Sequence, residues 1–147
     1  MKKTFIYMLL AIFLGAITGK ILYTKYEDTT SVFNEKSTAY FLQEGVYETK
    51  DSMDRNTKDI NPKLIINKNN KYYVYVGISK SIDGVNKIRR IYKKRGYNII
   101  PKEKEIKNES FLINLEQYDI LLESNTTIND ILAIEEVVLS NYEETFK

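Results

Sequence analysis

The regularly spaced carboxylates of the C-terminal third are the first residues to weigh for chemistry. Glu116, Asp119 and Glu123 would share one face of a helix, and paired carboxylates are the working groups of glycoside hydrolases. No pocket-forming pattern accompanies them. The chain of 147 residues contains no His and no Cys, which excludes imidazole and thiol catalysis, disulfides, and zinc or haem sites built on those ligands. We therefore predict a non-enzymatic protein without a metal or cofactor.

Aromatic and amide side chains offer a second chemistry, that of a binding surface. Successive side chains of a strand point to opposite faces of the sheet. If Leu42, Val74 and Val76 face covering helices, the intervening side chains face the other way. These are Phe41, Gln43, Tyr73 and Tyr75. The alternative is that the tyrosines bind no ligand and lie on a half-exposed strand only because tyrosine is common in strands.

The elements that would position these residues follow from local patterns. The pattern predicts strands over residues 40–47, 64–66 and 72–78, the last two forming a hairpin. It predicts a helix within residues 49–60 and another from Ser81, as cap, to Gly96. A fourth strand over 97–100 would end at Pro101. The fold class is α+β: a four-stranded antiparallel sheet in the order βαββαβ with two helices on one face.

A helical hairpin is predicted for the C-terminal extension, residues 104–147. Apolar residues recur there at helical spacing, and residues 123–126 would form the loop. Thr127 and Asp130 have the spacing of a capping box at the start of the second helix.

An apolar N-terminus indicates export. Lys2 and Lys3 precede an apolar run, and residues 1–23 are long enough to span the hydrocarbon core as a signal anchor. Cleavage near Thr18 is the alternative, in which case the protein is secreted. Residues 24–38 are polar and aperiodic, as expected of a tether. Both alternatives place the bulk of the chain outside the cytoplasm.

Charge is distributed in blocks. Residues 79–107 carry 10 basic and 3 acidic side chains, a net charge of +7, whereas residues 108–147 carry 1 basic and 9 acidic, a net charge of −8. Blocks of opposite sign either face each other or face different partners. The basic residues of the second helix are therefore a solvated face, a partner for the acidic hairpin, or a site for anionic wall polymers or lipid headgroups.

Two stretches resemble the halves of a SPOR domain, the sporulation-related repeat that binds bacterial cell-wall glycan. Residues 41–47, Phe-Leu-Gln-Glu-Gly-Val-Tyr, are similar to the opening strand of that family. Residues 73–78, Tyr-Val-Tyr-Val-Gly-Ile, are similar to its third strand and precede an amphipathic helix. Glu44 departs from the pattern, because the family usually has an apolar residue there. The resemblance covers about residues 39–103.

The resemblance implies a sheet whose helix-free face holds peptidoglycan strands stripped of their peptide stems, at division or sporulation septa. The glycan-binding residues would be Phe41, Gln43, Gly45, Tyr73 and Tyr75. Aromatic rings can pack on the C–H face of a sugar, and amide and phenol groups can bond its hydroxyls. The expected function is thus a single-pass membrane protein that binds peptidoglycan at the septum, in cell division or sporulation.

The alternative is an exported protein–protein interaction module of the cell envelope, with a SPOR-like fold that does not bind glycan. In either case residues 104–147 would contact a division or sporulation partner. Nucleic acid is not an expected partner, although RNA-recognition modules share the βαββαβ order, because the chain is expected outside the cytoplasm.

Overall fold

The computed structural model describes residues 38–146, which form an α+β fold around one antiparallel sheet. The strands are β1 (Thr38–Tyr47), β2 (Leu64–Lys68), β3 (Lys71–Ser79) and β4 (Ile100–Glu105). Their order in the sheet is β2-β3-β1-β4, so the two central strands are β3 and β1. The predicted four-stranded antiparallel sheet is confirmed.

Four helices accompany the sheet in the described residues: α2 (Lys50–Asn56), α3 (Ile82–Lys94), α4 (Glu109–Ser124) and α5 (Ile128–Phe146). Local signals locate most of their ends. Ser81 accepts a hydrogen bond from Gly84 N at the start of α3, and Gly96 follows its end with φ of 89°. Asp130 N donates to Thr127 Oγ1 at 3.2 Å, which confirms Thr127 as the cap of α5, and the Asp130 carboxylate accepts from the Thr127 hydroxyl and not from its backbone N–H.

The β2–β3 hairpin turns on Asn69 and Asn70. Both have positive φ, 53° and 58°, and the flanking residues Lys68 and Lys71 are cross-strand partners. This is the geometry of a two-residue primed turn, which matches the twist of the strands and tolerates asparagine. The predicted hairpin is confirmed, with both strands longer than expected.

The fourth strand differs from its prediction. It runs from Ile100 to Glu105 and contains Pro101, which was expected to end it. β4 pairs with β1 alone and so forms an edge of the sheet. Proline has no backbone N–H to donate, and an edge strand tolerates this because its outer side forms no strand–strand hydrogen bonds.

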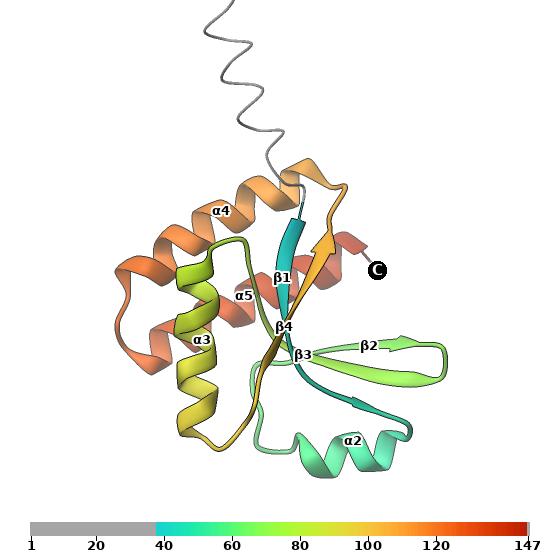
Figure 1. The fold of residues 1–147 in the computed structure, drawn as a ribbon. Helices are drawn as coiled ribbons and strands as arrows, with labels where there is room; N and C mark the ends of the chain where they lie inside the picture. The colour runs from blue at the N-terminus through green and yellow to red at the C-terminus, as the bar shows by residue number, and fades with distance from the viewer. Residues whose placement is uncertain (1–37, 147) are drawn as a thin grey trace, which may run out of the picture. The chain divides into compact units, whose positions relative to one another are not determined.

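Helices cover both faces of the sheet, which corrects the prediction of a bare face. Leu42 and Val76 belong to a core cluster with Val85 and Ile88 of α3, which Leu122 and Ile131 at the connected ends of α4 and α5 also join. Phe41, the neighbour of Leu42, belongs instead to a cluster with residues of α4 and α5. Because neighbouring strand residues point to opposite faces, α3 and the α4–α5 hairpin lie on opposite faces of β1. In Figure 1, α5 passes behind the strands.

The physical reason is that both faces of the sheet are apolar. On the hairpin face, Phe41, Leu64 and Tyr75 form a core with Leu115 and Val138 of the hairpin. A sheet that is apolar on both faces must be covered on both. The C-terminal hairpin is therefore part of the same core as the strands, and the described residues 38–146 form one compact unit.

The predicted membrane anchor, residues 1–23, and the predicted tether, residues 24–38, lie outside the described residues except for Thr38, which begins β1. Within residues 38–146, no helix combines the length and the apolar character that crossing a bilayer requires.

Candidate functional site

The two central residues of the predicted glycan site are buried. Phe41 is 1% exposed and Tyr75 is 3% exposed. Phe41 packs edge-on against Tyr75, with ring centroids 5.5 Å apart, and against Tyr142 of α5, at 5.1 Å. The expectation that these rings line an open face is wrong, because α5 occupies the space in which a sugar would lie.

The remaining predicted residues do not share one face. Gln43 pairs with Tyr75, whereas Gly45 pairs with Val74, since the register shifts between Gln43 and Gly45. Cross-strand partners lie on the same face, so Gly45 shares the face of Val74, and Tyr73 and Tyr75 lie on the other face. The irregularity at Glu44 moves Gly45 to the α3 side of the sheet, which corrects the predicted grouping with Gln43.

Gly45 also provides no gap between aromatic walls. A Cβ atom there would approach Tyr47 Oη to 2.9 Å, so the ring of Tyr47 fills the space beside the glycine. The Tyr47 hydroxyl in turn donates to Glu44 at 2.9 Å. Gln43, Gly45 and Tyr73 are half-buried.

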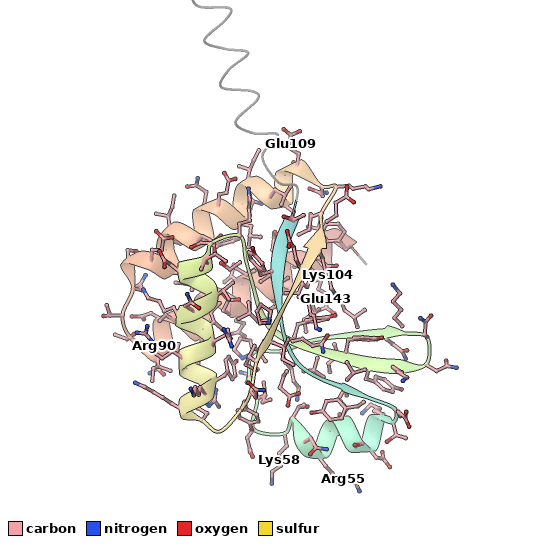
Figure 2. All side chains as sticks on the ribbon, in the orientation of Figure 1. Arg55, Lys58, Arg90, Lys104, Glu109 and Glu143 are labelled. Carbon is pink, nitrogen blue, oxygen red and sulfur yellow. The ribbon has the colours of Figure 1, made fainter. Side chains whose placement is uncertain are left out.

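Lys104 of β4 covers the aromatic pair, a contact that the sequence did not reveal. Its Nζ lies 4.3 Å from the Phe41 ring centroid and 4.1 Å from that of Tyr75, and it donates to Tyr75 Oη at 2.7 Å. Figure 2 shows Lys104 on β4, near the C-terminal end of that strand. Burial, with a smaller effect of Lys68, lowers the pKa of Lys104 to about 8.

The carboxylates considered for hydrolysis hold the turn between β3 and α3. Asp119 accepts from Ser79 Oγ at 2.6 Å, Lys80 N at 2.8 Å and Ser81 N at 3.2 Å. Glu123 accepts from Ser81 Oγ at 2.9 Å, and Glu116 pairs with Lys80. Burial raises the pKa of Asp119. These three carboxylates, Glu116, Asp119 and Glu123, therefore anchor α4 to the sheet, and they do not form a free pair that could act in hydrolysis.

A second buried carboxylate, Glu135, anchors α5. It is 0% exposed, and its Oε2 accepts from Ile78 N at 3.0 Å. Gly77 makes room for it, since a Cβ atom there would lie 2.6 Å from Glu135 Oε2. Within residues 38–146, Glu135 Oε1 has no hydrogen-bond partner. Burial raises the pKa of Glu135 well above its usual range, and Asp119 adds to the effect.

The basic and acidic blocks meet at Lys87. Its Nζ donates to the carbonyl oxygens of Leu122, Glu123 and Asn125, at 2.6, 2.9 and 2.7 Å. A cation at the C-terminal end of a helix is favourable, because the last carbonyls lack intrahelical partners. Part of the basic helix thus pairs with the hairpin, one of the alternatives left open by the sequence.

The rest of the basic helix lines an open groove. The groove has a volume of about 630 Å³ and lies between α3 and the segment that leads to β4. Its lining residues are Asn86, Arg89, Arg90, Lys93, Gly96, Tyr97, Asn98 and Ile99. Figure 2 shows Arg90 on the outer side of α3, away from Arg55 and Lys58 near α2.

A smaller hollow lies between the two helices of the hairpin. It measures about 340 Å³ and is lined by Tyr118, Glu136, Val137, Ser140, Asn141 and Glu144. Val137 is 50% exposed, and Ile113, Ile120 and Leu121 of α4 are further exposed apolar residues. The hairpin therefore presents acidic and apolar groups together.

No group of three or more acidic side chains in residues 38–146 has an arrangement that could hold a metal ion. Comparisons of the chain with protein-family models, curated proteins and solved structures found no match. The resemblance to SPOR domains therefore depends on the residues of β1 and β3 alone.

Proposed function

We propose that the protein is a non-enzymatic interaction module of the cell envelope, anchored in the membrane by its N-terminal segment. The burial of Phe41 and Tyr75 beneath α5 carries this proposal. The sheet is a packed middle layer between α3 and the hairpin, so binding takes place on the outer surfaces. This is the second of the two functions that the sequence supports.

Glycan binding by the sheet would require removal of the hairpin. A sugar stacked on Phe41 or Tyr75 would have to displace Tyr142 and the ammonium of Lys104. Displacing α5 would also break the buried hydrogen bond between Glu135 and Ile78 N. Loss of such a packed interface costs several kcal/mol, about the size of a domain's whole stability.

The hairpin is the surface that we assign to a protein partner. Glu136 and Glu144 supply negative charge around the hollow, and Tyr118 and Val137 supply partly exposed apolar area. Complementary charge steers partners together, and an aromatic or apolar anchor in a hollow supplies affinity. The partner expected is therefore a basic segment with an apolar anchor, presented by another envelope protein.

Photo-cross-linking from position 137 in living cells tests this assignment. A photoreactive amino acid replaces Val137 in the full chain, and a discrete adduct with an envelope protein is expected. Glu136→Lys with Glu144→Lys should abolish the adduct. The matched control is Glu103→Lys with Glu105→Lys, which makes the same charge change at exposed positions of β4 and should retain it.

A pelleting assay with amidase-treated sacculi tests the competing function. The full chain, solubilised in neutral detergent, should remain in the supernatant. Pelleting that is lost on Gln43→Ala and Tyr73→Ala would instead establish the sheet as a glycan site and overturn the proposal. Both residues are only half-buried, so these variants should fold.

A further inference from the structure

The groove beside α3 has the chemistry of an anion site. Three of its lining side chains, Arg89, Arg90 and Lys93, are cationic, and none is acidic. Arg89 is held in place, since its Nε donates to Ile99 O at 3.1 Å. Its terminal nitrogens form no ion pair with residues 38–146 and can bind a ligand. A guanidinium fixed by a backbone carbonyl loses less entropy when it binds an anion.

The cations of the groove differ from their neighbours on the same helix. Lys87 caps α4, and Arg95 donates to Asp59 O at 2.9 Å and lies over the Tyr92 ring. Arg90 and Lys93 are exposed and form no ion pair within the described part of the chain. Lys87 and Arg95 therefore bind other parts of the protein, whereas Arg90 and Lys93 are available to a ligand.

The size of the groove argues against a single small ion. Its volume of about 630 Å³ lies within the range of sites for drug-sized ligands, roughly 300–1,000 Å³. Asn86, Arg90 and Lys93 follow one another along α3, and a helix rises about 10 Å over those residues. An extended ligand with more than one negative group fits this row better than one free phosphate.

Two walls of donors favour phosphate over carboxylate. Arg90 and Lys93 approach from α3, whereas Tyr97 and Asn98 lie on the segment after it. A tetrahedral phosphodiester can accept from both walls, and its neighbouring hydroxyls can bond the neutral amide and phenol groups. A planar carboxylate offers only two oxygens in one plane.

We propose that this groove binds the phosphodiester groups of an anionic envelope ligand. The same chemistry occurs in a phosphodiester-linked polymer and in the headgroups of anionic lipids. The site is separate from the hairpin hollow and does not depend on the protein partner assigned to it.

Binding is measured on the full chain in nanodiscs of phosphatidylcholine, by fluorescence anisotropy of labelled poly(glycerol phosphate). Arg90→Gln with Lys93→Gln should weaken binding about tenfold, the effect of losing charged hydrogen bonds. The matched control is Arg55→Gln with Lys58→Gln, which removes the same charge at exposed positions near α2 and should change affinity less than about twofold. Unchanged thermal unfolding confirms that both variants fold.

Lysine acylation read by mass spectrometry distinguishes the two sources. Protection of Lys93 relative to Lys58 on addition of the polymer assigns the groove to a polymer. Protection in discs that contain phosphatidylglycerol, without polymer, assigns it to lipid headgroups. Either result supports the proposal.

Three results would overturn the proposal that the groove binds phosphodiester groups. The first is an absence of Lys93 protection in both arms. The second is an equal loss of affinity in the two double variants, which would show unspecific attraction to net charge. The third is binding of poly-glutamate as tight as that of poly(glycerol phosphate), which would assign the groove to acidic peptides.

Discussion

The ring of Tyr142 in α5 stands edge-on to the ring of Phe41 in β1, with centroids 5.1 Å apart and planes at 81°. Edge-to-face geometry at this distance is favourable between aromatic rings. Tyr142 also contacts Phe111 of α4, with centroids 5.5 Å apart. One aromatic cluster thus joins both helices of the hairpin to β1, one of the two central strands of the sheet.

Phe41 is expected to act as a core residue. Phe41→Ala should lower the free energy of unfolding by about 3–5 kcal/mol, because it removes a large buried side chain and leaves a cavity. Urea denaturation measures the loss, and Val46→Ala, at an exposed position of the same strand, is the control and should cost much less. A fully stable Phe41→Ala protein would show that α5 does not pack on β1.

Glu135 is expected to make stability fall as pH rises. Its raised pKa means that the folded state holds the proton more tightly, so its contribution is complete below the ordinary value of 4.5 and is lost as pH rises through the folded-state pKa. Glu135→Gln removes this ionisation and keeps an acceptor for Ile78 N. The variant should gain stability relative to the natural chain as pH rises from 5 to 8, because only the natural side chain must then ionise in a buried position.

Urea unfolding at pH 5 and pH 8 provides the measurement, and the gain should be larger at pH 8. Asp119→Leu is the contrasting variant. It leaves Ser79 Oγ, Lys80 N and Ser81 N without the carboxylate that accepts from them, so it should be destabilised by about 1–3 kcal/mol. A gain for Glu135→Gln that is the same at both pH values would contradict the assignment.

Lys87 is expected to stabilise the end of α4. Lys87→Met should lower the free energy of unfolding by roughly 1–3 kcal/mol, because three carbonyl oxygens lose a charged donor. Hydrogen exchange should quicken at residues 122–126. Lys94→Met, at an exposed position of the same helix, serves as the control and should leave both measurements nearly unchanged.

Lys104 is expected to titrate with a pKa of about 8. NMR titration of its Cε and Nζ resonances measures this value directly. Lys68→Gln should move the pKa upward, because Lys68 is one of the two causes of the depression. The folded state disfavours the charged amine, so stability should rise as pH increases from about 8 towards the ordinary value of 10.5. Titration at the ordinary value would mean that the amine is not held between the rings.

Local structure was largely predictable from the residues. Ser81 and Gly96 bracket α3, Thr127 and Asp130 start α5, and the sheet has the predicted number of antiparallel strands. Caps, turns and apolar periodicity act over a few residues, so they can be read without knowing the rest of the fold.

The candidate sites were less predictable because they depend on distant residues. The grouping of Gln43 with Gly45 failed at a register shift, which depends on how β1 pairs with β3. The groove at Arg90 and Lys93 was foreseen only as a charged face. The sequence did not show which lysines of α3 would form hydrogen bonds with the hairpin.

Local residue patterns were enough to predict most of the elements, their order, and the opposite charges of α3 and the hairpin. Long-range contacts place α5 over Phe41 and Tyr75, and they pair Lys87 with the hairpin while Arg90 and Lys93 face solvent. The reason is that strand alternation assigns side chains to two faces but does not specify which helices cover each face. That choice is made by long-range packing, in which the apolar side of the hairpin and its buried carboxylates fit one face of the sheet.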